Sequence, residues 1–373
     1  MKTRVERIDS PRPDVGLLSE AAEIVEAGGL VVFPTETVYG IACRVTPSAL
    51  ARLDAVKGRP AEKHYTLHIG HPDQIEHYVP SLKLRARKII QHGWPGPLTL
   101  VFPLSKEDLA LQAGKMGAAQ FEALYAQGTL GVRCPDHPVA STLLQAVKHA
   151  VVAPSANRSG RPAPKEAEAA LWDLDGLVEL VLDGGPCPMG ANSTVAKLGT
   201  EVEILRSGSF GVDRLRDLCE LKLLFVCTGN TCRSAMAEVI CRQVLMKKLD
   251  CKTLDEFDKL GYRVSSAGTM AVSGASASAG AMAAGAKMGL DLNSHRSTAL
   301  SASLLDEMDL IFAMEKSHRE TILSACPDVV DKCLLLDAQG DVEDPYGQSA
   351  PIFDACAELI GLAVQKRVGE LIL

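Results

Sequence analysis

The sequence predicts two α/β domains in tandem, and three observations support this fold class. The chain has 373 residues, which exceeds the usual length of a single domain. In its first half, short apolar runs bounded by glycine or proline alternate with segments of helical composition. A new apolar run, LKLLFV at 221–226, begins after a glycine-containing stretch and a charged stretch. We therefore place the boundary near 215–220 and expect domains at 1–215 and 216–373.

The elements of the first domain are predicted where apolar runs end at glycine or proline. Strands are expected at Leu30–Phe33, Leu100–Phe102, Leu130–Val132 and Val151–Ala153, with a late strand at Val202–Leu205. Helical composition marks Ala21–Ala27, Lys83–His92 and Lys165–Leu171, and Pro164 is well placed to open the last of these helices.

The second domain starts with a buried-strand run, a polar loop containing glycine, and a helix from about Ser234. A further helix is expected near Ile352–Leu362. Residues 271–289 are rich in alanine, glycine and serine, so they could form a flexible linker. A weak helical face favours instead a small-residue helix packed closely on a sheet, with Met282, Ala283, Ala286 and Met288 on that face.

Composition and charge exclude several classes of protein. Hydrophobic residues make up 47% and charged residues 23%, which indicates a globular protein with sizeable cores. No apolar run approaches the ~18 residues of a membrane-spanning helix, and the amino terminus lacks the apolar stretch of a secretory signal. The 11 cysteines include no CxxC pair, so we expect a reducing cytoplasm and neither a disulfide framework nor a zinc site. The two predicted domains carry net charges of −1 and −6, without the basic excess that strong direct nucleic-acid binding requires.

The strongest local signal is the segment VCTGNTCRSAMAE at 226–238, which lies between a predicted strand and a predicted helix. Backbone N–H groups of such a loop form a nest for an oxyanion, and the helix N-terminus adds its positive dipole end. The positive potential of these N–H groups and of the helix N-terminus also favours the thiolate of Cys227. The planar guanidinium of Arg233 can bind two phosphate oxygens at once. Gly229 lets the backbone turn tightly, and Ser234 can hydrogen-bond the thiolate. These groups predict a phosphoryl-transfer site with a phosphocysteine intermediate.

A leaving group needs an acid, and the sequence offers Asp344 in the segment Asp344-Pro345-Tyr346, ahead of the last predicted helix. A carboxylic acid at this position could protonate the leaving atom and later activate water.

With these motifs in place, residues 221–373 resemble the low-molecular-weight protein phosphatase family. Further matches lie at Ser265–Thr269, His295–Ser297 and Asp309–Met314. The resemblance implies a flavodoxin-like parallel sheet, no cofactor, and catalytic roles for Cys227 as nucleophile, Arg233 as phosphate clamp and Asp344 as general acid. It also implies a phosphate loop formed by Thr228, Gly229, Asn230, Thr231, Cys232 and Ser234. In this family Asn230 shapes the loop, Ser234 stabilises the thiolate, and Cys232 can form a protective disulfide with Cys227.

The substrate is a phosphorylated protein on this interpretation, and Thr231 bears on which residue carries the phosphate. Relatives directed at tyrosine usually have an aliphatic residue there, whereas the loop CTGNTCRS is similar to the protein-arginine phosphatase branch. The sequence therefore favours phosphoarginine, with phosphotyrosine as the alternative. Arsenate reduction uses a similar loop but needs further resolving cysteines, and a phosphate-sensing pseudoenzyme would not need all three catalytic residues.

The first domain contains no GxGxxG, no GxxxxGK[ST] and no metal-ligand cluster, so an anion must be held by less generic segments. Glycine- and proline-shaped stretches supply cationic partners and small polar groups for such a site. The cations are Lys57, Arg59, Arg133 and Arg206, and the small polar residues are Thr35, Ser155, Asn157 and Ser193.

Together and in this order, these stretches resemble the YrdC-type threonylcarbamoyl-AMP synthase family over about residues 10–212. The resemblance implies a twisted α/β sheet that joins L-threonine, bicarbonate and ATP, with Mg²⁺ accompanying ATP, in a step of tRNA modification that involves partner proteins. It assigns ATP to a set formed by Lys57, Arg59, Thr129, Ser155, Asn157 and Arg206. It assigns threonine to a set formed by Thr35, His68, Arg133, Ala153 and Ser193, with Arg133 on the amino-acid carboxylate.

Two alternatives remain open for the first domain. The same fold can present a concave surface that binds double-stranded RNA, so the domain could be a binding module without synthase activity. The four residues Lys57, Arg59, Ser155 and Asn157 and the near-neutral charge favour the enzyme. His68 could also be an ordinary surface histidine near a strand end. The sequence says nothing of coupling between the two sites.

Overall fold

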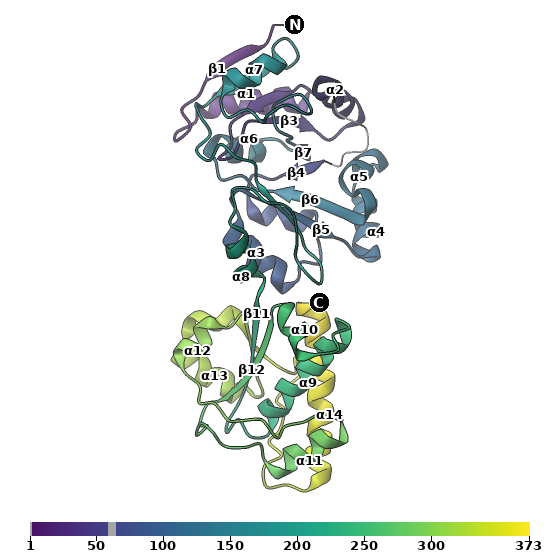
Figure 1. Cartoon of the computed structure of the whole chain (residues 1–373), viewed down its shortest axis with the longest axis vertical. Coiled ribbons are helices and arrows are strands. Elements are labelled where there is room, and N and C mark those ends of the chain that lie inside the picture. Colours follow the sequence, from purple (N-terminus) through teal and green to yellow (C-terminus); the bar gives the residue numbers. More distant parts are fainter. Residues whose placement is uncertain (1, 59–64) are drawn as a thin grey trace. The chain divides into compact units, whose positions relative to one another are not determined.

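The structure is a computed structural model that describes residues 2–58 and 65–373, and it consists of two compact units (Figure 1). The main division falls between Leu218 and Cys219. Across these described ranges, no helix combines the length and hydrophobicity needed to cross a bilayer.

Ten strands of the described ranges form one mixed sheet in the first unit, in the order β1-β8-β2-β3-β7-β4-β6-β5-β9-β10. Strands β4 and β6 pair in parallel, and β5 pairs antiparallel with β6. The strands are β1 (Arg4–Arg7), β2 (Val31–Phe33), β3 (Gly40–Arg44), β4 (Thr66–His68), β5 (Leu98–Pro103), β6 (Thr129–Arg133), β7 (Val151–Val152), β8 (Leu180–Asp183), β9 (Thr194–Lys197) and β10 (Glu203–Arg206).

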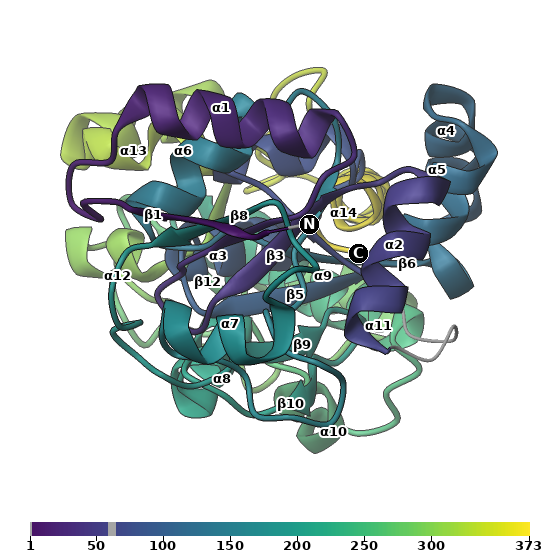
Figure 2. The same ribbon diagram turned by 90° about the horizontal axis from the view of Figure 1, so that it is seen from above.

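Helices cover both faces of this sheet. Figure 2 shows α1 and α6 on one face and α7 on the other. The inner face of α1 buries Leu18, Ala21 and Val25 in a core shared with α6, because its apolar residues recur at helical spacing. The helices are α1 (Val15–Glu26), α2 (Pro47–Lys57), α3 (Leu84–Gly93), α4 (Lys106–Lys115), α5 (Ala118–Leu124), α6 (Pro138–Ala146), α7 (Ala167–Leu174) and α8 (Val212–Cys219).

The strands predicted for the first domain are confirmed within a few residues, and the predicted helices correspond to α1, α3 and α7. Helix α1 begins at Val15, well before the predicted start at Ala21, and Pro164 does not open a helix. Helix α7 starts at Ala167, after Glu166 as its N-cap. The carbonyl of Pro164 instead accepts a hydrogen bond of 2.9 Å from the backbone N–H of Tyr39. The prediction was wrong because this tertiary contact holds Pro164 in the preceding loop.

The second unit has a four-stranded sheet with the order β12-β11-β13-β14, in which each pair is parallel. Two hydrophobic clusters occupy its two faces, with Phe225 and Phe312 on one face and Leu224 and Ile311 on the other. The first cluster includes residues of α9, α11 and α14, and the second includes residues of α12 and α13. This is the predicted flavodoxin-like arrangement of a parallel sheet between helices.

The bounds of the second unit agree with the predicted strand, loop and helix around 226–238. Its strands are β11 (Leu221–Cys227), β12 (Tyr262–Gly268), β13 (Leu310–Ala313) and β14 (Cys333–Leu335). Its helices are α9 (Arg233–Lys248), α10 (Leu254–Lys259), α11 (Ala279–Lys287), α12 (Ala302–Glu307), α13 (Lys316–Ala325) and α14 (Ala350–Arg367).

The segment 271–289 is helical only in its second half, and the predicted buried face was wrong. Helix α11 buries Ala281, Ala284 and Gly285, and its main contacts are with α14 and α9. A Cβ atom at Gly280 would lie 2.5 Å from the Phe353 ring of α14, so only glycine permits this close approach. An alanine-rich helix has little polar contrast around its axis, which is why its sequence did not identify the inner face.

Candidate functional sites

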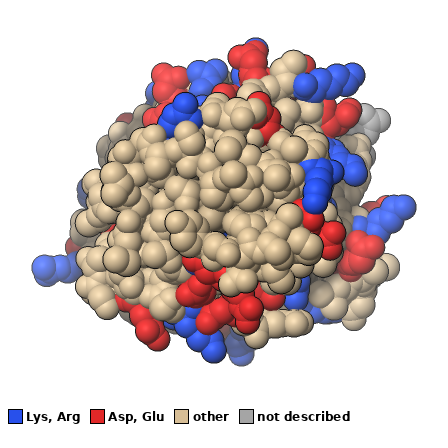
Figure 3. All heavy atoms as spheres, turned by 90° about the horizontal axis from the view of Figure 1, so that it is seen from below, with Lys and Arg blue, Asp and Glu red and all other residues tan. Residues whose placement is uncertain are grey.

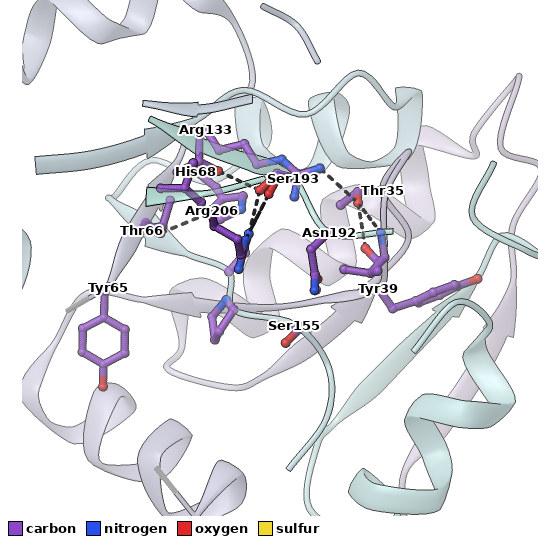
Figure 4. Close-up of a pocket in the computed structure, with 16 residues that line it drawn as sticks. Thr35, Tyr39, Tyr65, Thr66, His68, Arg133, Ser155, Asn192, Ser193 and Arg206 are labelled. Atoms are coloured by element: carbon purple, nitrogen blue, oxygen red, sulfur yellow. Dashed lines mark hydrogen bonds between the residues drawn. The ribbon is translucent and has the colours of Figure 1, made fainter. Parts of the chain in front are cut away.

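A cavity of about 310 Å³ lies in the first unit, at the ends of strands on the mixed sheet (Figure 4). This volume is within the range of pockets that bind small molecules. All five residues predicted to contact threonine line it, namely Thr35, His68, Arg133, Ala153 and Ser193. Two residues predicted on the ATP side, Ser155 and Arg206, line it as well.

Arg133, at the end of β6, is the main buried cation of this cavity. One of its terminal nitrogens donates to Glu36 Oε1 at 2.9 Å and to Thr37 Oγ1 at 2.6 Å. Its Nε is buried and has no hydrogen-bond partner among the described residues. Because Arg133 is a buried cation that lines the cavity, the arrangement suits an anionic ligand.

Glu36 was not among the predicted site residues. Its side chain is 6% exposed, against 8% for Arg133, so the two form a buried ion pair. The preceding residue, Thr35, was predicted as a site residue, but Glu36 could be paired with Arg133 only once the fold brought them together.

His68 lies at the end of β4, beside Arg133 on the neighbouring strand β6. Burial, together with the positive charge of Arg133, lowers the pKa of His68 to about 3, so the imidazole is neutral at pH 7. Nδ1 lies 3.0 Å from the carbonyl oxygen of Thr66 and therefore carries the proton. Nε2 is then a hydrogen-bond acceptor. His68 is 7% exposed, so it is not a surface histidine.

Ser193 and Arg206 form a second polar group in the cavity (Figure 4). The Ser193 hydroxyl lies 2.9 Å from the hydroxyl of Thr99 on β5. The Arg206 guanidinium donates to the Ser193 carbonyl oxygen at 2.9 Å and 3.2 Å. These bonds hold Arg206 in the wall of the cavity with its charge available to an anion.

Lys57, Ser155 and Asn157 also lie together. Lys57 Nζ donates to the backbone carbonyl oxygens of Ser155 and Asn157, the latter at 2.7 Å. The Ser155 hydroxyl donates to Asn157 Oδ1 at 2.5 Å. These three predicted residues thus form one connected cluster, which reaches the cavity through Ser155.

Two of the predicted ATP contacts lie elsewhere. Thr129 opens β6 and pairs with Pro103, about 13 Å along the strand from Arg133, and it does not line this cavity. Arg59 lies outside the described residues.

The second site is the loop between β11 and α9. Cys227 Sγ lies 2.9 Å from the Ser234 hydroxyl and 3.3 Å from the backbone N–H of Asn230, which points at the sulfur. Cys227, Ser234 and Arg233 are all buried. The loop therefore supplies the hydrogen bonds that a thiolate nucleophile requires.

Asn230 fixes the shape of this loop. It has φ of 54°, in the left-handed region that asparagine tolerates better than most residues. Its amide nitrogen donates to the hydroxyls of Ser234 at 2.9 Å and Ser266 at 2.8 Å. Its amide oxygen accepts from the backbone N–H of Thr298 at 2.7 Å, and its carbonyl oxygen lies 2.7 Å from His295 Nε2. The residues at Ser266 and His295 belong to segments that the sequence had already singled out.

Arg233 opens α9 and is held from two sides. One terminal nitrogen pairs with Glu315 and donates to the Val342 carbonyl oxygen at 2.8 Å, and the other lies 2.8 Å from Asp344 Oδ2. Its Nε is buried without a partner among the described residues. The predicted clamp and acid, Arg233 and Asp344, are thus neighbours, whereas Glu315 was not predicted.

Cys232 and Thr231 complete the loop. Both Cys227 and Cys232 are free thiols in this structure. Burial raises the pKa of Cys232, and its Sγ lies 3.1 Å from the Ser278 hydroxyl. Thr231 accepts a backbone hydrogen bond of 2.8 Å from Ser278 through its carbonyl oxygen. Its side chain is partly exposed.

An uncharged segment lies beside this loop. Residues 269–286 contain no charged side chain, and the backbone N–H of Met270 bonds to the Thr228 carbonyl oxygen at 2.9 Å. Met270 and Val272 are nevertheless 78% and 81% exposed. Figure 3 shows a broad face of the molecule on which charged side chains lie mostly near the margin. Exposed apolar side chains beside a reactive loop are typical of a surface that receives another molecule.

Comparison with known proteins gives a family match for each of the two units. Residues 23–208 match the family of Sua5, YciO and YrdC, described as "Telomere recombination", and residues 222–371 match the family described as "Low molecular weight phosphotyrosine protein phosphatase". A threonylcarbamoyl-AMP synthase of Bacillus subtilis is 33% identical over 189 residues, which are 50% of this chain and 52% of that protein. A putative threonylcarbamoyl-AMP synthase of Mycobacterium tuberculosis is 38% identical over 205 residues, which are 54% of this chain and 88% of that protein.

A solved structure, Sua5 of P. abyssi complexed with L-threonine, has a TM-score of 0.52 at 20% identity, covering 97% of this chain and 98% of that chain. At this identity the likeness concerns the fold alone.

The fold and the sites define a chain that joins two enzyme-family domains. It belongs to the Sua5, YciO and YrdC family through its first unit, and its second unit is a low molecular weight phosphotyrosine protein phosphatase domain. Both resemblances drawn from the sequence are thereby confirmed. The chain spans about half the length of the first curated relatives it matches, which are the proteins of B. subtilis (52%) and P. abyssi (49%).

Proposed function

We propose that the first unit forms L-threonylcarbamoyladenylate from L-threonine, bicarbonate and ATP. The observation that carries this proposal is the buried Arg133, which lines a cavity of about 310 Å³ together with the four other residues predicted for threonine. Arg133 binds the threonine carboxylate while Glu36 holds its guanidinium in place. The neutral His68 accepts a hydrogen bond from the amino acid through Nε2.

The chemistry requires the threonine amine as a nucleophile. The amine attacks the carbon of bicarbonate, and loss of water gives a carbamate. A carbamate oxygen then attacks the α-phosphorus of ATP, the bond to the bridging oxygen breaks, and pyrophosphate leaves. The protein contributes mainly by holding the reactants in position and by stabilising negative charge on the phosphates.

ATP is expected on the side of the cavity formed by Arg206, Ser155 and the cluster of Lys57 and Asn157. Arg59 and Thr129 stay predictions for the same substrate, and Mg²⁺ would accompany its triphosphate. The tRNA-modification partners that would use the product, and a cytoplasmic location where ATP and reduced thiols are available, belong to the same proposal.

The test is threonine-dependent pyrophosphate release by the full chain. Lys57→Ala and Arg59→Ala should each lower kcat/KM by at least about 30-fold, because each removes a charge-assisted contact. The Cys227→Ser chain is the matched control and should release pyrophosphate at the wild-type rate. Unchanged release in Arg59→Ala would contradict the assignment of Arg59, and no release by the wild type would contradict the synthase. An RNA titration across salt concentrations then tests the binding-module alternative.

We propose that the second unit hydrolyses phosphorylated proteins through a phosphocysteine. The supporting observation is Cys227 Sγ, which lies 2.9 Å from the Ser234 hydroxyl and accepts from the backbone N–H of Asn230. The same loop ends at Arg233, whose guanidinium pairs with Asp344. Cys227 attacks phosphorus, and the bond to the leaving atom breaks as Asp344 donates a proton to it. Asp344 then takes a proton from water, which attacks the phosphocysteine and releases phosphate.

We further infer that phosphoarginine is preferred to phosphotyrosine. Thr231 places a hydroxyl on the partly exposed side of the loop, where it can hydrogen-bond a guanidino group. The test compares kcat/KM of the wild type on matched phosphoarginine and phosphotyrosine peptides. Cys227→Ser should abolish both activities. A wild type that prefers phosphotyrosine would reject phosphoarginine and leave a tyrosine phosphatase.

A further inference from the structure

His318 is a buried histidine that neither proposed reaction uses. It lies on α13, is 4% exposed, and places Nε2 2.8 Å from the hydroxyl oxygen of Thr228. Thr228 directly follows the nucleophile Cys227 in the phosphate loop. A histidine from another helix therefore contacts the first side chain of that loop.

The position of His318 is fixed by contacts at the start of its helix. Glu315, the residue before α13, pairs with Arg233 and accepts from the Ser317 hydroxyl at 3.0 Å. The backbone N–H of Lys316 donates to Asp341 Oδ1 at 2.8 Å. The helix that carries His318 is thus tied to the same residues that hold the phosphate clamp.

The imidazole of His318 is neutral at pH 7. Burial lowers the pKa of His318 below its ordinary value, and the charge of Arg233 acts in the same direction against the opposing carboxylates of Glu315, Asp344 and Asp341. A neutral imidazole has a single N–H, so the proton lies either on Nε2 or on Nδ1.

The contacts favour the proton on Nε2. Nδ1 is buried and has no hydrogen-bond partner among the described residues, and an orphaned buried N–H is rarer than an orphaned acceptor. Nε2–H therefore donates to the Thr228 oxygen. The hydroxyl hydrogen of Thr228 must then point to another acceptor, and the described residues provide none at hydrogen-bond distance.

Among the described residues, Thr228 has no acceptor for this hydrogen, which therefore remains for a bound molecule. Its carbonyl oxygen already accepts from Met270 N–H at 2.9 Å, which fixes the backbone, and its side chain is partly exposed. We propose that His318 is a positioning residue that orients the Thr228 hydroxyl as a further hydrogen-bond donor to the oxygens of the bound phosphoryl group. This inference rests on the proposed phosphatase function of the second unit.

The experiment measures two quantities on the full chain: the inhibition constant of inorganic phosphate and kcat/KM for p-nitrophenyl phosphate. Thr228→Val, which keeps the shape but not the hydroxyl, should raise the inhibition constant about tenfold, the usual effect of losing a hydrogen bond to a charged group. Thr228→Ser should stay within about twofold of the wild type. Thr321→Val is the matched control, because Thr321 is exposed on α13 and its hydroxyl bonds, among the described residues, only to the Ser317 carbonyl oxygen of its own helix.

Variants of His318 test the orientation. His318→Gln keeps an N–H donor near the position of Nε2 and should keep phosphate inhibition within about threefold, whereas His318→Leu should weaken it about as much as Thr228→Val. In the double variant Thr228→Val with His318→Leu, the effects should not add, because both remove the same donor. If His318→Leu does not fold, the comparison of Thr228→Val with Thr228→Ser decides the question.

Three results would contradict the proposal: no change in Thr228→Val, equal damage from Val and Ser at 228, or equal damage from Gln and Leu at 318 in folded proteins. A wild type that neither hydrolyses p-nitrophenyl phosphate nor binds phosphate would instead reject the phosphatase function itself.

Discussion

The guanidinium of Arg133 lies 2.9 Å from the carboxylate of Glu36, and both side chains are buried in the first unit. The two residues come from different parts of the sheet, since Arg133 ends β6 and Glu36 follows β2. Arg133 Nε has no hydrogen-bond partner in the part of the chain that the structure describes. Glu36 therefore anchors a guanidinium that also lines the cavity.

Replacing Glu36 by glutamine should affect stability and threonine binding together. Glu36→Gln leaves the charge of Arg133 buried without its counter-ion, which typically costs about 3 kcal/mol of unfolding free energy. The substitution also leaves the guanidinium of Arg133 less firmly positioned, so KM for threonine should rise about tenfold. Urea unfolding and pyrophosphate release measure the two effects. Glu23→Gln, at an exposed position of α1, should change neither. A Glu36→Gln chain with wild-type KM would show that Glu36 does not position Arg133.

His68 should make the first unit less stable in acid. Its pKa is about 3 when folded, against about 6.5 in the unfolded chain, so the unfolded state binds more protons between these values. The free energy of unfolding of the first unit therefore decreases as pH falls below 6.5. His68 alone accounts for a decrease of about 2 kcal/mol at pH 5. His68→Asn retains a donor for the Thr66 carbonyl oxygen and should remove that part of the pH dependence.

Tryptophan fluorescence can measure this effect selectively. The sequence contains two tryptophans, Trp94 and Trp172, and both belong to the first unit. Urea unfolding of the full chain, followed by fluorescence at pH 7 and pH 5, therefore reports on that unit. The same pH dependence in the wild type and in His68→Asn would exclude His68 as its source.

Asn230 should be sensitive both to its backbone conformation and to its side chain. Asn230→Gly tolerates the φ of 54° but loses the bonds to Ser234 and Ser266. Asn230→Ala loses the same bonds and adds strain of about 1 kcal/mol or more in the left-handed region. Both variants should lower kcat by more than about tenfold, since the loop no longer holds its donors.

Hydrogen exchange of the loop and α9 should rank these variants as wild type, Asn230→Gly and Asn230→Ala, from most to least protected. Asn293→Ala, at an exposed position, is the control and should behave as wild type. Equal exchange in the glycine and alanine variants would mean that the left-handed conformation carries no strain.

Thr231→Ile should change substrate preference. An aliphatic group removes the hydroxyl expected to contact a guanidino-phosphate and offers an apolar wall to an aromatic ring. A change of this kind shifts discrimination by about 10–200-fold. The ratio of kcat/KM for phosphoarginine and phosphotyrosine peptides should fall accordingly. A ratio equal to that of the wild type would exclude Thr231 as the selector.

Much of both sites could be predicted from the sequence because the residues lie in short, local motifs. Cys227, Arg233 and Ser234 are fixed by a single strand–loop–helix connection, and their neighbourhood follows from it. The carboxylates that pair with the arginines of the two sites could not be predicted in this way. Glu315 reaches Arg233 across 82 positions of the chain, and Glu36 reaches Arg133 across 97. Nothing in the local pattern distinguishes these carboxylates from those on the surface.

The fold shows a similar division. Strands bounded by glycine or proline were predicted within a few residues, because turn chemistry acts locally. The inner face of α11 was not, because alanine and glycine recur on all sides of it and the contact between Gly280 and Phe353 decides its packing. Pro164 was misplaced for the same kind of reason, since a hydrogen bond from Tyr39 determines its role.

The ion pairs of Arg233 with Glu315 and Asp344 have a consequence for turnover. Before any substrate arrives, the guanidinium already has two internal anions as partners. Phosphate must compete with these carboxylates for the same nitrogens, so part of its attraction is cancelled by the contacts it displaces. The inorganic phosphate left after hydrolysis is then expelled more readily than from a bare arginine. The carboxylates of Glu315 and Asp344 therefore compete with inorganic phosphate for Arg233. This competition limits product inhibition and leaves the loop free to bind the next phosphoprotein.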